Sequence, residues 1–217
     1  MIIEQRSQEW FNIRKGKMTS SEIHKIMGKE GLSETAKTYL LEKVSESLGG
    51  FAASATGPAL GWGTDLESMG SEVYGEKTGY KVDRASFMVV NDYYGGSPDG
   101  LVAPDGIIEI KCPYNSANHF KHGLIKTDAD FKKIAPSYYY QCISNIICAK
   151  AQWCDFISFD PRVDPKYTMF IYRLNRNESE VENMLARVEI ATKYLQELKD
   201  KIENANNNEI NEVDTAQ

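Results

Sequence analysis

The feature that most constrains this fold is a turn between two short apolar runs, in the stretch from Ser97 to Pro113. The triplet Pro104-Asp105-Gly106 has the residue types that favour a tight turn. Each flanking run is long enough for only a short strand, because strands average about 5–6 residues. We therefore predict two strands that form a hairpin or near-hairpin.

The second run alternates apolar and charged side chains, with Ile108 and Ile110 as its apolar members. Because successive side chains of a strand point to opposite faces, Glu109 and Lys111 would share one face. The hairpin would bring Asp99 to the same point. Two carboxylates and an amine beside apolar strands are what a hard divalent cation and an attacking water need.

These charges also have an ordinary interpretation, as surface groups or a simple ion pair. The isoleucines at 107, 108 and 110 nevertheless indicate a run that is half buried or more. Burying a charge is costly unless the charge is paired or binds a metal. From the residues alone, an ion pair and a metal site both stay open.

The composition bounds the class of protein. A chain of 217 residues can bury a core in one domain without disulfides, and 41% hydrophobic and 26% charged residues are typical of a soluble globular protein. No run approaches the roughly 18 apolar residues that span a membrane. Met1–Arg6 lacks the layout of a signal peptide. We therefore expect a cytoplasmic protein with no membrane partner.

The net charge of −6 argues against a protein that coats nucleic acid unselectively. An acidic exterior can still surround a local basic lining. Two groups of basic residues are candidates for that lining, although such groups are more often solvated faces: Arg14-Lys15-Gly16-Lys17, and Lys121, His122, Lys126, Lys132 and Lys133.

The cysteines show no CxxC spacing, so a zinc site has little support. Buried thiols in a reducing compartment are the better account of Cys112, Cys142, Cys148 and Cys154. An iron–sulfur cluster held by four cysteines is the alternative.

Hydrophobic periodicity and turn residues predict groups of helices and strands. Helices are expected at 7–15, 19–27, 34–48, 62–78, 136–149 and 178–203. Strands are expected at 80–90, in the hairpin, at 152–159 and at 166–174. The rest comprises a mobile loop at 51–61, an irregular region with one short helix at 114–134, and a disordered tail at 204–217. This order describes one domain, 1–203, of the α/β or α+β class, with a mixed sheet flanked by helices. The apolar stripe of the last helix would pack on the sheet, or in part against another subunit.

A capping box is predicted at Thr19 and Glu22, so the second helix would start there. Ser20 and Ser21 would then lie in its first turn, where free N–H groups favour an anion. Arg14 lies just upstream. A plain helix cap and a phosphate pocket are both compatible with this pattern.

The pattern Asp99…Glu109-Ile110-Lys111 resembles the PD-(D/E)xK nuclease signature, and further segments make the resemblance more specific. In order, they are similar to the phage lambda exonuclease family of viral recombination nucleases from about residue 5 to 200. The matching segments are Gln8-Glu9-Trp10-Phe11, Arg14, Met18-Thr19-Ser20-Ser21-Glu22, Trp62-Gly63 with Glu67, Ser97-Pro98-Asp99-Gly100-Leu101, Glu109-Ile110-Lys111-Cys112-Pro113, Tyr138 with Gln141, and Asp160-Pro161-Arg162. The resemblance implies a restriction-endonuclease-like fold, with a mixed central β-sheet flanked by helices.

The resemblance also implies a two-metal site for Mg²⁺, for which Mn²⁺ would substitute. Asp99, Glu109 and the backbone carbonyl of Ile110 would hold one ion. Glu67 would reach the cluster directly or through water and help to place a second ion.

Three other side chains would complete the catalytic set. Lys111 would orient or deprotonate the attacking water and stabilise the charge that develops on phosphorus. Gln141 would position the nucleophile or a metal-bound water, with Tyr138 beside it. The histidines at 24, 119 and 122 are expected to be structural or exposed.

A second pocket, formed by Arg14, Ser21 and Ser97, would hold the 5′-phosphate of the degraded strand. The family degrades one strand of linear duplex DNA from the 5′ end, forms ring-shaped trimers, and passes the 3′ single-stranded tail to a single-strand annealing protein. Residues 49–61 and 114–133 do not align confidently, so trimer contacts and duplex-splitting residues are not transferred. Two alternatives stay open: a restriction-like or repair endonuclease of the same superfamily, and a DNA-end-binding module without catalysis.

Overall fold

The computed structural model describes residue 5 and residues 7–28, 30–50 and 58–214. Most of the loop expected at 51–61 lies outside these residues. A helix already begins at Pro58 and runs to Thr78 (α3), so it starts before the predicted position of 62. None of the described helices combines the length and the apolar content that crossing a bilayer requires.

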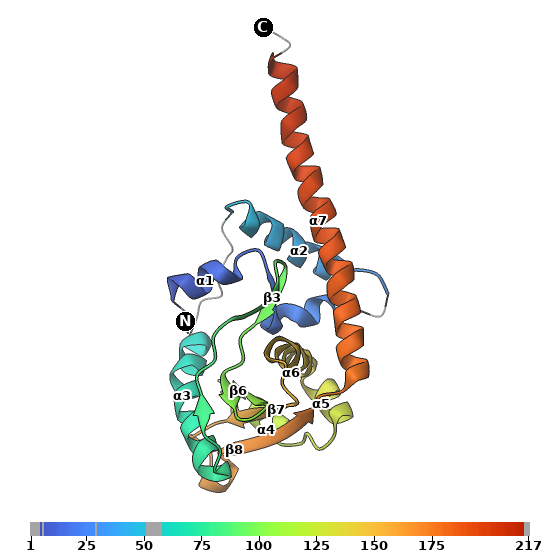
Figure 1. Cartoon of the computed structure of the whole chain (residues 1–217). Helices are drawn as coiled ribbons and strands as arrows, with labels where there is room; N and C mark the ends of the chain where they lie inside the picture. The colour runs from blue at the N-terminus through green and yellow to red at the C-terminus, as the bar shows by residue number, and fades with distance from the viewer. Residues whose placement is uncertain (1–4, 6, 29, 51–57, 215–217) are drawn as a thin grey trace.

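A five-stranded mixed sheet forms the centre of the protein (Figure 1). Its strands, in spatial order, are β2 (Val82–Asp83), β5 (Gly100–Val102), β6 (Gly106–Lys111), β7 (Trp153–Phe159) and β8 (Met169–Asn175). Strands β6 and β7 are parallel, and the other neighbours are antiparallel. The predicted mixed sheet and the predicted β5–β6 hairpin are both confirmed.

Alternation along β6 decides which helix covers which face. Ile108 and Ile110 belong to a core cluster with Tyr74 of α3. Gly70 allows α3 to approach closely, since a Cβ there would lie only 3.2 Å from Cγ2 of Ile110. Ile107 belongs to the other cluster, which it shares with α6 (Pro136–Ala149). The odd-numbered residues of β6 therefore face α6.

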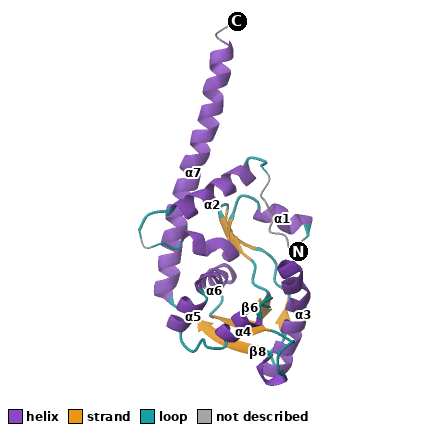
Figure 2. Cartoon of the chain, turned by 180° about the vertical axis from the view of Figure 1, so that it is seen from behind, coloured by secondary structure: helices purple, strands orange, loops and turns teal. Residues whose placement is uncertain are grey.

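A smaller sheet joins the N-terminal segment to the hairpin. Its strands, in spatial order, are β1 (Met18–Thr19), β4 (Tyr94–Gly96) and β3 (Met88–Asn91). Around it lie α1 (Gln8–Arg14), the 3₁₀ helix η1 (Ser20–Ile26) and α2 (Glu34–Ser47). Figure 2 shows these strands and helices beside the larger sheet. Because β4 leads directly into Ser97, this sheet brings the N-terminal residues to the start of the hairpin.

Two expectations near these strands were wrong. The single strand predicted at 80–90 is split between the two sheets, because Val82–Asp83 pairs with β5 and Met88–Asn91 with β4. The predicted capping box does not form, since the Thr19 side chain caps no helix N–H. Thr19 is held in β1 by pairing with β4, and Glu22 forms an ion pair with Lys25 instead.

The region at 114–134 contains two short helices rather than one. They are α4 (Ser116–His122) and α5 (Asp128–Ile134), and a short 3₁₀ helix, η2 (Pro165–Tyr167), lies between β7 and β8. The Asn115 side chain caps α4, and Thr127 with Asp130 forms a capping box at α5. Both caps use residue types that favour helix starts, so local rules account for the second helix.

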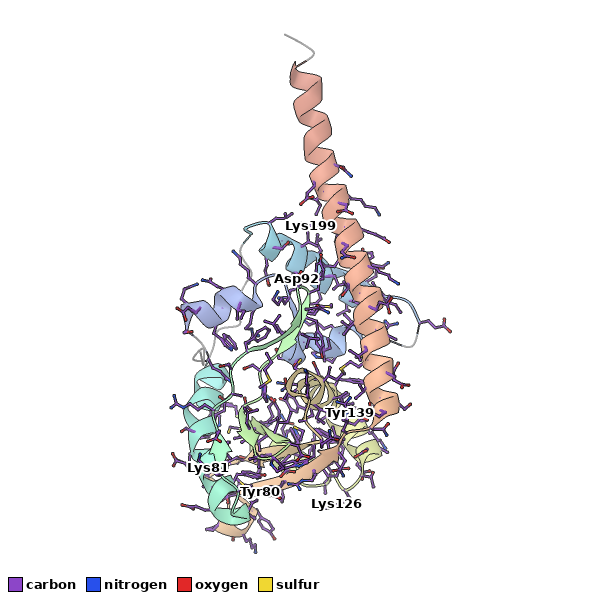
Figure 3. The ribbon with its side chains drawn as sticks, viewed as in Figure 1. Tyr80, Lys81, Asp92, Lys126, Tyr139 and Lys199 are labelled. Atoms are coloured by element: carbon purple, nitrogen blue, oxygen red, sulfur yellow. The ribbon has the colours of Figure 1, made fainter. Side chains whose placement is uncertain are left out.

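The last helix, α7, runs from Glu178 to Asp214. Its apolar stripe packs chiefly against α2, α6 and η1 rather than on the sheet. The tail expected to be disordered from residue 204 is helical to Asp214, because no proline or glycine interrupts it and adding residues to an existing helix is easy. Beyond Lys199, α7 projects away from the rest of the protein (Figures 1 and 3).

Candidate active site

A cleft of about 160 Å³ lies where the hairpin, α6 and the N-terminal segment meet. It collects side chains from widely separated parts of the chain. Its lining comprises Gln5, Trp10, Arg14, Thr19, Ser20, Ser21, Glu67, Phe87, Ser97, Asp99, Glu109, Lys111 and Gln141. Apart from Tyr138, every side chain predicted for the two pockets lines this one cleft. We call Glu67, Asp99, Glu109, Lys111 and Gln141 the acidic set, and Gln5, Trp10, Arg14, Ser21 and Ser97 the cationic set.

Glu109 is the most enclosed member of the acidic set, with 1% of its surface exposed. Its Oε1 lies 2.5 Å from Nζ of Lys111, which confirms that both side chains share one face of β6. The same oxygen accepts a hydrogen bond of 2.6 Å from Nε2 of Gln141. The α6 helix therefore closes the cleft over the charged face of β6.

Asp99 is fixed against β6 by two hydrogen bonds. Its backbone N–H donates to the carbonyl of Ile108 at 3.1 Å, and its Oδ2 accepts from the N–H of Ile110 at 2.7 Å. A residue's N–H and C=O point to the same side of a strand, so the Ile110 carbonyl also points toward the Asp99 side of β6. This places the predicted backbone ligand on the side where Asp99 lies.

The remaining predicted residues of this region lie close by. Glu67, on α3, is half-buried and lines the cleft. The ring of Tyr138 lies 5.2 Å from Nζ of Lys111, so it stands beside the acidic set but outside the cleft lining.

Burial changes the ionisation of the acidic set. It raises the pKa of Glu109 to about 8, with Asp99 adding to the rise and Lys111 opposing it. Burial lowers the pKa of Lys111, but the charges of Glu109 and Asp99 outweigh it, and the net pKa is raised. Lys111 is therefore an ammonium group at neutral pH, better suited to orienting water and stabilising negative charge than to removing a proton.

The acidic set fits a hard cation by its chemistry. Carboxylate and carbonyl oxygens are the ligands that Mg²⁺ prefers, and Mg²⁺ uses one or two carboxylates together with waters and substrate phosphates. Within the described ranges, no three His, Cys, Asp or Glu side chains already form a metal-binding cluster. Asp99 and Glu109 would thus supply a small ligand set that waters and substrate complete.

Arg14 provides the positive charge of the cationic set. Its guanidinium lies 3.7 Å from the ring centre of Trp10 and 5.7 Å from that of Phe87. Burial lowers the pKa of Arg14 to about 10, so it remains charged at neutral pH. The aromatic rings hold the charged group in place in the cleft wall.

A hydrogen-bonded serine accompanies this charge. Nε2 of Gln5 donates to Oγ of Ser97 at 2.9 Å and to the carbonyl of Pro98 at 3.0 Å. Because the Ser97 oxygen accepts from Gln5, its own proton is available to an anion. Ser21 is exposed, and its hydroxyl lies 3.3 Å from that of Thr19. The set therefore presents one cation and two hydroxyls to the cleft.

Sequence reasoning missed two residues of this region. The side chain of Gln5 hydrogen-bonds that of Ser97, which is distant in the sequence, and no local pattern predicts that contact. Asn145 donates to Oε2 of Glu109 at 2.7 Å. It follows Gln141 by one helical turn, and this pair of amides on one face of a largely apolar helix is a signal that the sequence carries.

Other predicted groups lie elsewhere. Of the two basic segments, only Arg14 lines the cleft. His119 and His122 are buried, and Nδ1 of each lies within 3.0 Å of the Ser158 hydroxyl, which supports a structural role. The cysteines are unpaired, with Cys112, Cys142 and Cys154 buried and Cys148 half-buried.

Comparisons with known proteins agree with the resemblance seen in the sequence. A family model described as a YqaJ-like viral recombinase domain matches residues 9–152. The chain is similar to an alkaline exonuclease (LHK-Exo) from Laribacter hongkongensis, with 27% identity and a TM-score of 0.82 over 93% of this chain and 99% of that one. The structure of LHK-Exo in complex with dAMP gives 28% identity, a TM-score of 0.81 and the same coverage, 93% and 99%.

A phage-related exonuclease from Haemophilus somnus 129PT shares 20% identity, with a TM-score of 0.72 over 86% of this chain and 96% of that one. At that identity the likeness shows the fold alone. The comparison with curated proteins returned no match. Together, the matches confirm the resemblance inferred from the sequence.

Proposed function

Because the chain belongs to the YqaJ-like viral recombinase family, we propose that it is a metal-dependent 5′-to-3′ exonuclease acting on linear double-stranded DNA. The observation that carries this proposal is the shared cleft. The acidic set, with the buried Glu109 at its centre, and the cationic set line the same cavity, so a phosphodiester and a terminal phosphate can be bound together. Cleavage that starts at a 5′-phosphorylated end requires both.

The similar LHK-Exo has been solved in complex with dAMP. A deoxynucleoside monophosphate is the product that stepwise cleavage of DNA releases. We infer that the cleft of this chain accepts a terminal deoxynucleotide of the same class, and its polar lining supports that inference.

The acidic set would carry out the cleavage. Asp99, Glu109 and the Ile110 carbonyl would hold one Mg²⁺ or Mn²⁺ ion, and Glu67 would help to place a second. When bound, the ions would stabilise the entering and leaving oxygens. Lys111, as an ammonium group, would orient the attacking water and stabilise the negative charge on the phosphate.

Gln141 would complete the same arrangement. Its amide already contacts the oxygen of Glu109 that faces the cleft, so it lies within reach of a water beside that oxygen. Tyr138 packs next to Lys111 and would limit the orientations of its ammonium group. Both act by holding the reacting groups in place.

The cationic set would determine where the enzyme starts. Arg14 would pair with the terminal 5′-phosphate, and the hydroxyls of Ser21 and Ser97 would donate to it. A phosphate fixed at one distance from the acidic set places the first phosphodiester there. The enzyme would then act from ends rather than within a strand.

The product would be a duplex with a 3′ single-stranded overhang. Such a strand is the substrate of a single-strand annealing protein, and we propose that the two proteins act together in phage-type recombination in the bacterial cytoplasm. A ring-shaped homotrimer enclosing the DNA would complete this assembly.

One gel tests the function. Linear duplex labelled at the 5′ or the 3′ end, with and without a 5′-phosphate, is incubated beside a closed circle, in Mg²⁺ and in EDTA. We expect Mg²⁺-dependent loss of the 5′ label as mononucleotide, fastest on phosphorylated ends, with the circle intact. Cleavage of the circle would indicate an endonuclease instead. Tight binding of ends without cleavage in Mg²⁺ or Mn²⁺ would indicate a binding module.

A further inference from the structure

The two oxygens of the Glu109 carboxylate have different surroundings. Oε1 meets Lys111 and Gln141, both of which line the cleft. Within the part of the chain that the structure describes, Oε2 accepts from one donor, Nδ2 of Asn145, at 2.7 Å. Asn145 is 0% exposed and does not belong to the cleft lining. One oxygen of Glu109 is therefore hydrogen-bonded by side chains that line the cleft, and the other by a side chain in the protein core.

The surroundings of Asn145 are tightly packed. A Cβ at Gly96 would lie 2.7 Å from Oδ1 of Asn145, so strand β4 passes directly over the amide. The amide thus has little freedom to turn away from Glu109.

The orientation of the amide is also determined by chemistry. In the described structure, the buried Oδ1 of Asn145 has no hydrogen-bond partner. Turning the amide over would point this oxygen at Glu109, and in the ionised form of Glu109 that binds a metal the two acceptors would repel each other. A buried acceptor without a partner is unfavourable. The hydrogen bond from Asn145 to Glu109 is therefore the favourable interaction that explains an amide at this position.

We propose that Asn145 is a positioning residue that holds Glu109 for metal binding. By fixing Oε2 from the core side, it keeps Oε1 turned into the cleft beside Asp99. Asn145 itself touches neither the cleft nor the substrate, and it acts only through Glu109. This inference rests on the proposed metal-dependent function.

A purely structural role makes a different prediction. If Asn145 only filled space in the core, its loss would lower the stability of the protein and leave the metal affinity unchanged. Partners that hold a metal-ligating side chain typically change the metal affinity by about 10- to 100-fold when they are removed. Metal affinity measured without DNA therefore separates the two roles.

The test uses the full chain and Mn²⁺ alone, with free Mn²⁺ measured by electron paramagnetic resonance. Asn145→Leu keeps the approximate size of the side chain and removes the N–H. Asn145→Ser shortens the side chain beyond reach of Glu109 and serves if the leucine variant does not fold. Ser144→Ala is the matched control, because Ser144 is equally buried on the same helix and its hydroxyl hydrogen-bonds Ser20 and Tyr94 rather than Glu109.

We expect the Mn²⁺ dissociation constant to rise about 10-fold or more in either Asn145 variant and to stay within about 2-fold in Ser144→Ala. The Mg²⁺ concentration for half-maximal cleavage should rise in parallel. A folded Asn145 variant that binds Mn²⁺ like the unmodified chain overturns the inference alone. If the unmodified chain binds no Mn²⁺, the metal-dependent function is overturned as well.

Discussion

The two sets that share the cleft are built in different ways. In the acidic set, Glu109 and Lys111 lie on β6, while Gln141 and Glu67 lie on the helices α6 and α3. Asp99, just before β5, is hydrogen-bonded to β6, and the Glu109 side chain is 1% exposed. The cationic set lies on α1 and just before it, on η1 and in the loop after β4, and Ser21 is exposed. The groups proposed to perform the chemistry are thus held by the larger sheet and two helices packed on it, whereas those proposed to recognise the DNA end sit on short local segments.

Their supporting contacts differ in the same way. Glu109 accepts three hydrogen bonds, from Lys111, Gln141 and Asn145. In the cationic set, Arg14 is held by stacking on Trp10, and one amide supports Ser97. We therefore expect changes in the acidic set to abolish turnover, and changes in the cationic set to alter the choice of DNA end.

The largest effect is expected for Lys111→Met. Removing a preorganised charge from the reacting centre typically costs roughly 10²- to 10³-fold in kcat. The fold should survive at neutral pH, because Glu109, whose pKa is raised to about 8, can bind a proton in place of the lost cation. The measurements are cleavage of 5′-phosphorylated duplex and thermal unfolding.

Lys37→Met is the control for this variant, since Lys37 lies on α2, does not line the cleft, and pairs with Glu34. It should cleave at the unmodified rate. Turnover by Lys111→Met within about 10-fold of the unmodified rate would show that Lys111 does not supply the main stabilisation of the negative charge on the phosphate.

The next effect concerns Arg14→Met, which keeps a long apolar side chain over Trp10 and removes the charge. A hydrogen bond to a charged group contributes about 1.5–3 kcal/mol. The preference for 5′-phosphate over 5′-hydroxyl ends should therefore fall by about 10- to 100-fold in kcat/KM. Turnover on hydroxyl ends should change little.

Arg84→Met is the matched control, because Arg84 is exposed and does not line the cleft. Its end preference should equal that of the unmodified chain. If Arg14→Met keeps the full preference, the phosphate is bound elsewhere.

A third prediction concerns a support behind the acidic set. Asp160 is 0% exposed and accepts from Arg162, which also donates to the carbonyls of Pro113 and Tyr114, after the end of β6. The hydrogen bond from Arg162 lowers the pKa of Asp160 to about 2. Asp160→Asn should lower the free energy of unfolding at pH 7 by on the order of 1 kcal/mol.

The pH dependence has a definite sign. Because the folded-state pKa is depressed, the stabilisation by Asp160 is fully present above about pH 4 and is lost as the pH falls toward 2. Urea unfolding of both proteins from pH 7 to pH 3 should show their difference shrinking at the acidic end. A difference that stays constant would assign the effect to packing. The preference for phosphorylated ends should not change.

The contrast between the two sets also explains what could be predicted from the sequence. Alternation along β6 is a local rule, so the shared face of Glu109 and Lys111 was predictable. The start of α6 at Pro136 was predictable for the same reason, because proline favours the first helical turn.

The errors arose where distant contacts override local rules. Thr19 looks like a helix cap, but pairing with β4 holds it in a strand. The stripe of α7 looks like a sheet-facing surface, but α2 and α6 reach it first. Gln5 hydrogen-bonds Ser97 in a fold that also pairs β1 with β4, and no window of sequence contains both residues.

The smallest effect is expected for a substitution at Gln5, which tests the cationic set, the set with fewer supporting contacts. Gln5→Leu removes the N–H that engages the Ser97 oxygen, so the hydroxyl would be free to turn toward the carbonyl of Pro98 instead of an anion. A neutral hydrogen bond contributes about 0.5–1.5 kcal/mol, so the phosphate preference should fall by about 2- to 10-fold while kcat at saturation is unchanged. Competition between phosphorylated and hydroxyl ends measures this ratio directly. Gln8→Leu is the control, because Gln8 is exposed, lies outside the cleft lining and hydrogen-bonds Asn12. A loss of kcat in Gln5→Leu would contradict the division between the two sets, since it would show that the cationic side also governs the alignment of the scissile bond with Asp99 and Lys111.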